Sequence, residues 1–369
     1  MKCEISFEKL KQAVALTERA AGRRTTLPVL SCILIDIRKG TAIFKATNLD
    51  VGVEVEVPVK SDGEGVFAVP AHTISSFLSQ IDGKEQVVRI EPSSGNLNIT
   101  LSKSKGVLKT LPSEDFPAIP TVSDVPAVIL PTETLGKGLR SVWYSASVSN
   151  VKPELSSVYI YRDGDSMVFA ATDSFRLAEK RINLPSKGVA IEDMLVPFKN
   201  TVDISRVLEA LGPTVSVASN KNLVSFEANG IRATSRIVNG IFPDYKQIIP
   251  KGYSTECIVL KQDLINTLKV SSVFSDTFNQ VRFTIDPKKK LFSVETKNSD
   301  VGENRSELDA AITGEALEIN FNCKYITDCF QSIDADSLSL QFNGKNKPLV
   351  IRPVSGDQSF LYLVMPMNR

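Results

Sequence analysis

One pattern occurs three times along the chain, at intervals of about 125 residues. In each copy an apolar, strand-like run leads into a short polar segment, at residues 45–50, 170–177 and 295–300. An interval of this length is the size of a complete domain. The repetition therefore predicts three similar domains in series, and any fold assigned to the chain has to satisfy it.

The sequence on either side of these segments also repeats. Before each one, alternating apolar and polar residues run into turn residues, which is typical of a β-hairpin; the first strands lie at residues 32–37, 158–161 and 281–285. Apolar residues at spacings of three and four predict two helices per repeat. The expected helical spans are 8–24, 70–81, 133–145, 199–209, 261–272 and 322–331.

Helices that pack on antiparallel strands define an α+β domain, and we expect this fold class in all three repeats. Similar proline-containing segments end the first two repeats, at residues 115–120 and 242–250. They place the domain boundaries near residues 121 and 251. The expected domains are 1–121 (N-terminal), 122–251 (central) and 252–369 (C-terminal).

The composition is that of a soluble globular chain, with 42% hydrophobic and 23% charged residues. No apolar run approaches the roughly 18 to 20 residues that a membrane-spanning helix needs. The N-terminal residues 1–8 lack the apolar core of a secretory signal. We therefore expect a cytoplasmic protein.

Motifs for catalysis or cofactor binding are missing. The sequence has no phosphate-binding P-loop, no glycine-rich dinucleotide motif and no nucleophile elbow. Its single histidine, His72, lies at the start of a predicted helix, so a histidine-based metal centre would need nearly all its ligands from other residues. The five cysteines form no CxxC pair, and we expect buried, reduced thiols. The sequence predicts no catalytic residues, no metal and no cofactor.

An aspartate occurs in the polar segment of every repeat, at Asp50, Asp173 and Asp300. Three equivalent active sites with such different surroundings would be unusual. An aspartate in a turn commonly accepts hydrogen bonds from nearby backbone N–H groups. We therefore interpret these carboxylates as turn residues.

Charge is distributed unevenly although the formal net charge is only +1. The six expected helical spans carry twelve basic and seven acidic residues, a net of +5, and the remainder carries −4. Solvated outer faces of ordinary helices would explain this equally well for a single repeat. If the helices of all three repeats face the same way, however, they form one basic surface suited to a phosphate backbone. No aromatic residues alternate with the basic ones, so duplex DNA is favoured over single strands.

Four separated segments carry a family resemblance: residues 24–30, 171–178, 240–245 and 364–367. In this order they resemble the bacterial sliding clamps, the beta subunits of DNA polymerase III, over the whole chain. The resemblance implies that two chains form a ring of six similar domains around duplex DNA, without catalysis. Twelve helices at a spacing of about 9–10 Å leave a bore of roughly 25 Å, which admits a double helix.

The resemblance also implies partners and residue roles. The partners are duplex DNA, a second copy of the chain, the alpha subunit of the replicative polymerase, the clamp loader and other clamp-binding proteins of replication and repair. DNA-facing positions fall on Arg24, His72 and Lys199, and the contact between the two chains falls on Leu108, Val273 and Phe274.

A peptide-binding cleft between the central and C-terminal domains is the main protein-binding site that the resemblance implies. It maps onto Lys152, Leu155, Thr172, Ser174, Phe175, Arg176, Leu177, Pro243, Ile248, Val364, Met365, Pro366 and Met367. Phe175 stands where the family often has histidine, and Lys246-Gln247 where it has arginines, which makes the cleft less basic and more apolar. Gly106 stands where a phenylalanine can occur, which implies a weaker joint between chains.

Two other classes of function remain open from the sequence. A repeat-built scaffold would bind proteins but no DNA, and its basic helices would not line one concave surface. An unrecognised enzyme would have a deep pocket in only one repeat, with an acid of perturbed pKa.

Overall fold

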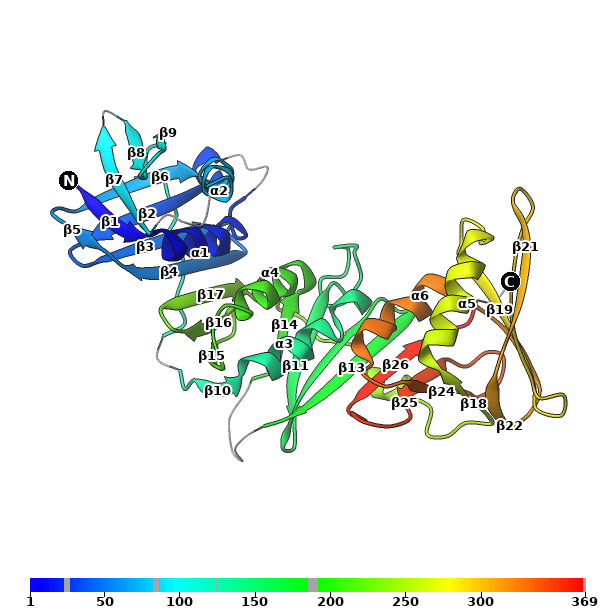
Figure 1. Ribbon diagram of the computed structural model, residues 1–369. Coiled ribbons are helices and arrows are strands. Elements are labelled where there is room, and N and C mark those ends of the chain that lie inside the picture. The colour runs from blue at the N-terminus through cyan, green and yellow to red at the C-terminus, as the bar shows by residue number, and fades with distance from the viewer. Residues whose placement is uncertain (23–26, 82–85, 94, 124, 185–191, 368–369) are drawn as a thin grey trace. The chain divides into compact units, whose positions relative to one another are not determined.

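A computed structural model describes residues 1–22, 27–81, 86–93, 95–123, 125–184 and 192–367 (Figure 1). The chain divides into two compact units, which we describe separately. Unit 1 consists mainly of Met1–Gly136 and Lys199–Ile237, and unit 2 mainly of Lys137–Gly188 and Val238–Arg369.

Unit 1 contains two antiparallel sheets. The five-stranded sheet has the order β5-β1-β7-β8-β9, and the eight-stranded sheet has the order β10-β15-β16-β17-β4-β3-β2-β6. The strands of the first sheet are β1 (Cys3–Ser6), β5 (Lys60–Ser61), β7 (Val87–Ser93), β8 (Asn96–Thr100) and β9 (Lys105–Lys109). The strands of the second are β2 (Cys32–Arg38), β3 (Thr41–Thr47), β4 (Val51–Pro58), β6 (Gly65–Pro70), β10 (Val128–Pro131), β15 (Thr214–Ser219), β16 (Leu223–Ala228) and β17 (Ile231–Arg236).

The helices of unit 1 bury one apolar face each. They are α1 (Phe7–Glu18), the 3₁₀-helix η1 (Pro28–Ser31), α2 (Ala71–Ser79) and α4 (Phe198–Leu208), which begins at the border between the units. The expected helix 8–24 is shorter in the structure, because α1 ends at Glu18. The N–H groups of Ala20 and Ala21 donate to the carbonyls three residues earlier, and this tighter pattern closes the helix.

Unit 2 also contains two antiparallel sheets. The nine-stranded sheet has the order β14-β11-β12-β13-β26-β25-β24-β18-β22, and the four-stranded sheet the order β21-β20-β19-β23. The large sheet consists of β11 (Ser157–Asp163), β12 (Ser166–Thr172), β13 (Arg176–Asn183), β14 (Met194–Pro197), β18 (Thr255–Leu260), β22 (Ala310–Gly314), β24 (Ser337–Phe342), β25 (Leu349–Pro353) and β26 (Phe360–Val364). The small sheet consists of β19 (Gln280–Asp286), β20 (Leu291–Asn298), β21 (Gly302–Leu308) and β23 (Leu317–Asn322).

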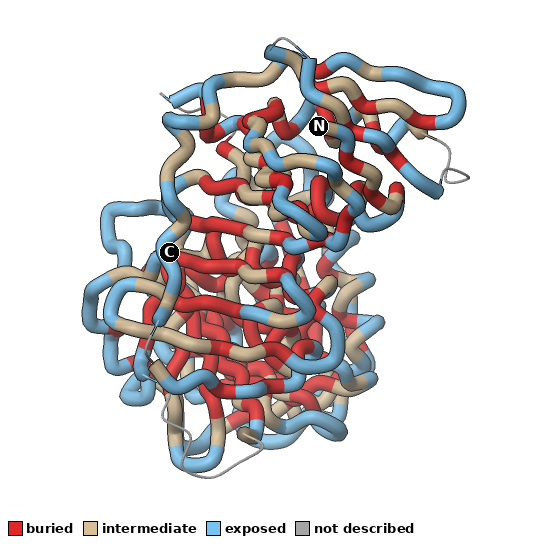
Figure 2. The backbone as a smooth tube through the Cα atoms, turned by 90° about the vertical axis from the view of Figure 1, so that its left-hand side faces the viewer, coloured by how far each residue is buried: buried red, intermediate tan, exposed pale blue. Residues whose placement is uncertain are grey.

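The other helices belong to unit 2, except that the first five residues of α3 belong to unit 1. They are α3 (Thr132–Arg140, which begins in unit 1), η2 (Trp143–Ser145), η3 (Tyr245–Ile248), α5 (Lys261–Val273), α6 (Cys323–Asp328) and η4 (Cys329–Ser332). The expected helices 133–145 and 322–331 each break into an α-helix and a short 3₁₀-helix. In both units the buried residues follow the strands, whereas turns and outer helix faces are exposed (Figure 2).

The three expected hairpins are confirmed as β2–β3, β11–β12 and β19–β20. The side chains that stabilise the polar turns after them differ from those expected in two repeats. Asn48 accepts the backbone N–H groups of Asp50 and Val51, and Asn298 accepts that of Asp300. In the central repeat Asp173 does the same for Phe175 and Arg176. The equivalent turn residues are therefore Asn48, Asp173 and Asn298, and Asp50 and Asp300 only follow them.

Several other properties follow from this packing. All five cysteines are buried and free: Cys3, Cys32, Cys257, Cys323 and Cys329. Within the described residues no helix is both long and apolar enough to cross a membrane. The same residues contain no cluster of three or more histidine, cysteine or acidic side chains that could hold a metal ion.

Candidate functional site

The centre of the candidate site is the pairing of strands β13 and β26 in unit 2. These strands run antiparallel, with Leu177 opposite Leu363 and Arg176 opposite Val364. Beyond the end of β26, the backbone N–H of Met365 donates to the carbonyl of Phe175 at 2.8 Å. The pairing thus brings together the two segments that the sequence comparison assigned to a cleft, although almost 190 residues separate them.

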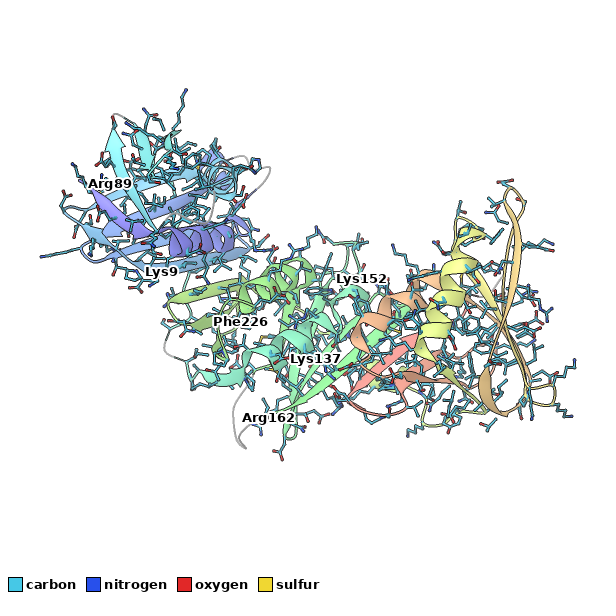
Figure 3. The ribbon with its side chains drawn as sticks, viewed as in Figure 1. Lys9, Arg89, Lys137, Lys152, Arg162 and Phe226 are labelled. Carbon is cyan, nitrogen blue, oxygen red and sulfur yellow. The ribbon has the colours of Figure 1, made fainter. Side chains whose placement is uncertain are left out.

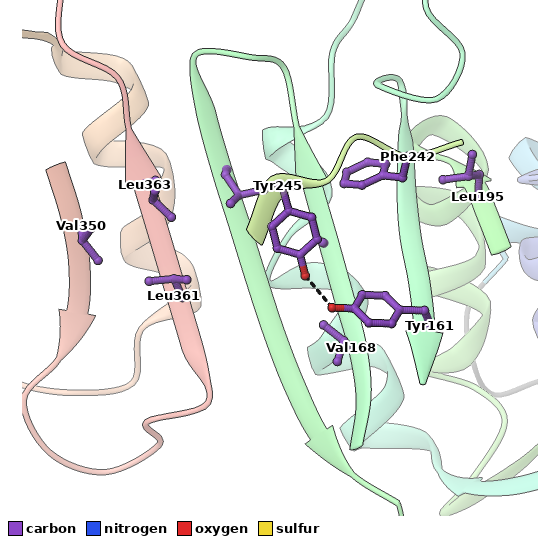
Figure 4. Packing of buried hydrophobic residues seen from close by; sticks show 10 residues of the cluster. Tyr161, Val168, Leu195, Phe242, Tyr245, Val350, Leu361 and Leu363 are labelled. Carbon is purple, nitrogen blue, oxygen red and sulfur yellow. Dashed lines mark hydrogen bonds between the residues drawn. The ribbon is translucent and has the colours of Figure 1, made fainter. Parts of the chain in front are cut away.

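The register of this pair decides which side chains share a face. Directly opposed residues project to the same side of a sheet, and neighbours along a strand project to opposite sides. Leu177 and Leu363 belong to one buried apolar cluster that also contains Val168 and Ala170. Figure 4 shows the cluster, with Leu363 and Val168 labelled. Val364, which was expected in the cleft, is fully buried and belongs to the other face. Leu363 is the residue that accompanies Leu177.

The segment 242–249 covers this face of the sheet. Phe242 and Tyr245 are buried in the cluster, whereas Pro243 and Ile248 are exposed. The hydroxyl of Tyr245 lies 2.8 Å from that of Tyr161 and donates a hydrogen bond to the buried carboxylate of Glu179. Burial and the nearby Glu179 both raise the pKa of Tyr245, so this hydroxyl stays protonated and keeps donating. The hydrogen bonds among Tyr161, Tyr245 and Glu179 hold residues 242–249 against the sheet.

The rim of the site consists of one exposed aromatic ring and three half-buried apolar residues. The Phe175 ring is 61% exposed, and Met365, Pro366 and Met367 are half-buried. Ser174 is exposed and has a positive φ of 77°, which turns the chain so that Phe175 points outward. Met367 is held by its backbone N–H, which donates to the carbonyl of Asn320 at 2.8 Å.

Most of the remaining expected cleft residues are buried and support the loops around the site. Thr172 is buried, and its hydroxyl donates to the carbonyl of Arg176 at 2.7 Å. Leu155 is buried as well, in a turn whose exposed residues include Lys152 (Figure 3). These residues shape the loops around the site, and among them Lys152 is the one that a ligand could reach.

Arg176 is neutralised within the protein. Its guanidinium lies 3.0 Å from the carboxylate of Asp173, forms an ion pair with Asp328, and stands 4.7 Å over the ring of Tyr325. The Phe175 ring stacks near the same tyrosine, with 6.5 Å between ring centroids. The sequence reasoning missed Tyr325 and Asp328, because α6 lies about 150 residues downstream and no local pattern connects the two segments.

The expected DNA-facing residues occupy matching places in the repeats. His72 and Lys199 are the second residues of α2 and α4, and both are exposed. His72 lies 3.7 Å from the carboxylate of Glu18. Lys324, the second residue of α6, is the third member of this set, and repeat alignment could have found it. Arg24 lies outside the described residues.

Of the residues expected between chains, one lies in the edge strand β9 of unit 1 and two lie at the end of helix α5 in unit 2. Leu108 is buried in β9, whereas its neighbour Val107 is 59% exposed and is the outward-facing apolar residue. In unit 2, Val273 is 66% exposed at the end of α5 and Phe274 is half-buried. An added Cβ at Gly106 would lie 2.9 Å from the Phe77 ring, so this ring already fills the space that a larger residue would take.

Comparison with known proteins connects this arrangement to a class. Models of the DNA polymerase III beta subunit match three parts of the chain: the N-terminal domain at residues 1–120, the central domain at 129–244 and the C-terminal domain at 246–368. A beta sliding clamp from Synechocystis sp. is 30% identical over 389 residues, covering 100% of this chain and 99% of that protein. One from Caulobacter vibrioides is 27% identical over 376 residues, covering 100% of both.

Solved structures agree with these matches. The DNA polymerase III beta subunit of Thermotoga maritima has a TM-score of 0.93 at 25% identity, covering 100% of this chain and 99% of that one. The sliding clamp of Bacillus subtilis has a TM-score of 0.93 at 24% identity, with the same coverage. Three α+β repeats with this pairing define the class of DNA sliding clamps. The chain belongs to the DNA polymerase III beta subunit family, whose members are processivity factors for DNA polymerase.

Proposed function

We propose that the chain acts without chemistry of its own, by encircling duplex DNA and tethering the polymerase through the Leu177–Leu363 site of unit 2. The observation that carries this proposal is the apolar rim formed by the exposed Phe175 and Ile248 and the half-buried Met365 and Met367, beside the buried pair Leu177 and Leu363. We further propose three domains with boundaries near residues 121 and 251. The family matches at 1–120, 129–244 and 246–368 support these limits.

Two open sheet edges support a ring of two chains. Strand β9 ends the five-stranded sheet of unit 1 and β21 ends the four-stranded sheet of unit 2. The first edge exposes Lys105 and Lys109, and the second exposes Glu303, Arg305 and Glu307, a net negative edge. Pairing β9 of one chain with β21 of its partner would join opposite charges and bury Val107 and Val273. A two-fold axis uses such a contact twice and closes the assembly.

DNA contact in this proposal uses the exposed basic residues of the helices. Lys199, His72 and Arg24 would make loose, water-mediated contacts with phosphates, which carry no sequence information and permit sliding. In the same proposal, the clamp loader and proteins with clamp-binding motifs are further partners, and the chain works in the cytoplasm.

The site in unit 2 fits a short apolar peptide. Methionine side chains repack at low cost, so Met365 and Met367 suit peptides from several partners. Phe175 adds an exposed ring, and because Arg176 already has carboxylate partners, acidic residues of a peptide gain little there. Apolar anchors should therefore dominate the peptide preference.

Substitution of the two methionines tests the proposal. Met365→Glu with Met367→Glu should weaken binding of a fluorescent polymerase-derived peptide by more than about tenfold, a loss of about 1.4 kcal/mol. Fluorescence anisotropy measures this, and Val354→Glu, at an exposed apolar residue of the same unit, is the matched control. Unchanged peptide affinity in the methionine variant would place the docking site elsewhere. Peptide binding without any retention on circular DNA would favour a scaffold that binds proteins alone.

A further inference from the structure

A recess of about 340 Å³ opens on unit 2, where the chain enters its last repeat. It lies between residues 250–253 and the strands β24 and β25, which contribute Gln341 and Arg352 to its lining. Within the part of the chain that the structure describes, no residue that lines it is acidic. Neither the proposed DNA contacts nor the peptide site uses this recess.

The pairing of the strands places the recess on the same face of the sheet as the peptide site. Leu363 of β26 lies opposite Leu177 on one side and opposite Val350 on the other. Val350 in turn lies opposite Gln341, and Figure 4 shows it on the strand beside that of Leu363. Directly opposed residues project to the same side, so the four form one row across the sheet. Arg352 lies two residues beyond Val350 and therefore shares this face.

The distance between the two places is short enough for one peptide. Neighbouring strands lie about 4.8 Å apart, so the two strand spacings between Leu363 and Gln341 amount to about 10 Å. An extended chain rises about 3.3 Å per residue and covers this distance in about three residues. One segment borders both places, because the exposed Ile248 is at the rim of the peptide site and Pro250 lines the recess. A peptide anchored at the site can therefore reach the recess.

The recess carries positive charge without a counter-charge. Arg352 is half-buried and Lys251 is exposed. Among the described residues, neither has an acidic side chain within ion-pair distance. Glu256 lies opposite Gln341 on β18, but its carboxylate accepts hydrogen bonds from Ser339 and Gln341. The two cations are thus available to a ligand.

We propose that the recess binds an acidic side chain of a docked partner, about three residues from the apolar anchor at the Leu177–Leu363 site. The inference rests on the proposed function. A carboxylate accepts two parallel hydrogen bonds from the Arg352 guanidinium, and Lys251 adds a second cation. The half-buried position of Arg352 strengthens this contact relative to a fully exposed pair. Arg176, at the peptide site itself, cannot take this part because two aspartates already neutralise it.

A set of peptides tests the inference on the unaltered chain. Each carries the apolar motif of a polymerase-derived clamp-binding peptide and one glutamate, placed in turn at positions on either side of the motif. Its reference has glutamine at the same position. Fluorescence anisotropy should show about fivefold tighter binding with glutamate at about three residues from the motif, and no gain directly beside it. No gain at any position would overturn the inference.

Substitutions in the chain assign the gain to the recess. Arg352→Gln should abolish the preference for glutamate and leave the affinity of the glutamine peptide within about twofold. Lys288→Gln removes the same charge from the exposed β19–β20 turn of the same unit and should keep the preference. Lys251→Gln, at an exposed residue, leaves the packing intact and should reduce the preference by about twofold. A full preference in both recess variants would overturn the inference.

Three outcomes separate this inference from the proposed function. If the glutamine peptide does not bind the unaltered chain, or binds Met365→Glu/Met367→Glu equally well, the proposed function fails. If it binds through the methionines and glutamate adds nothing, only the inference fails. Weaker binding of a short fluorescent duplex by Arg352→Gln, with the glutamate preference unchanged, would assign the recess to nucleic acid and overturn the inference as well.

Discussion

The sheet passes from one repeat to the next at two places, and the two crossings differ in chemistry. In unit 1, β17 pairs with β4 from Ile231–Val55 to Ser235–Val51. In unit 2, β13 pairs with β26 from Arg176–Val364 to Lys180–Phe360. The two strands pair antiparallel at both crossings. The first crossing buries valines and has a half-exposed ion pair, Arg232–Glu54 at 3.3 Å.

The second crossing buries charge instead. The Lys180 side chain is 2% exposed and forms an ion pair with Asp357, and Arg176 is 10% exposed between two aspartates. Burying ion pairs gives little net stability, but breaking one leaves a charge without its partner. We infer that the second crossing tolerates fewer substitutions than the first, and it is the one that forms the peptide site. Three substitutions test this difference.

The largest effect is expected for Asp357→Asn. It leaves the buried Lys180 ammonium without a counter-charge, and we expect unit 2 to lose about 3 kcal/mol of unfolding free energy. Urea unfolding measures the loss. Glu318→Gln removes one partner of the exposed Arg282 pair in the same unit and should change stability by less than about 1 kcal/mol. Similar losses in the two variants would remove the distinction between buried and exposed pairs.

The same pair predicts a pH dependence. Burial favours the neutral carboxyl of Asp357, but hydrogen bonds from Lys180 and Ser359 outweigh it and lower the pKa from its usual 3.8. The unfolded chain therefore takes up the proton first, and the stabilisation is fully present above about pH 5 and decreases as the pH falls below it. The difference in unfolding free energy between the unaltered chain and Asp357→Asn should therefore shrink as the pH falls from about 5 toward about 2. A constant difference would contradict the assigned partner.

An intermediate effect is expected for Tyr245→Phe. The change removes the hydroxyl between Tyr161 and the buried Glu179, at a cost of about 1.5 kcal/mol, and loosens residues 242–249. Peptide affinity should fall together with stability, since this segment closes the site. Tyr253→Phe is the matched control, because that hydroxyl is on an exposed residue and reaches Glu256 at 3.3 Å. Unaltered peptide binding in Tyr245→Phe would mean that residues 242–249 keep their place without the Tyr245 hydroxyl.

The smallest effect is expected at the first crossing. Arg232→Gln removes half-exposed pairs with Glu54 and Glu227, and the loss should be about 0.5 kcal/mol. Thermal unfolding of unit 1, compared with an Arg89→Gln control at another exposed pair, measures it. A loss as large as that of Asp357→Asn would show that the two crossings are energetically alike.

Local patterns predicted much of the fold. Alternation and turn residues located the three hairpins, because those signals lie within about a dozen residues. Repetition at 125 residues indicated three α+β domains. The pairing of β4 with β17 and of β13 with β26 left no local signal, since each joins strands that are far apart in sequence. For this reason the compact units of the structure cut across the central repeat.

The sequence indicated which segments belong to the proposed site, but not which of their side chains share a face. The register places Leu363, and not Val364, on the face of Leu177, because one residue along a strand reverses the face. Similarly, the turn carboxylates were located in the right segments but assigned to Asp50 and Asp300, where Asn48 and Asn298 make the hydrogen bonds. Sequence spacing does not distinguish such neighbours, whereas the register does.

The five buried thiols have a practical consequence. Burial raises the pKa of Cys3 and Cys323 to about 11 and that of Cys257 to about 12, so little thiolate forms near neutral pH. Alkylating reagents should therefore label these side chains only when the surrounding structure opens. Cys3 and Cys32 lie in unit 1 and the other three in unit 2. Timed labelling of the unaltered chain would thus record, residue by residue, which unit opens first.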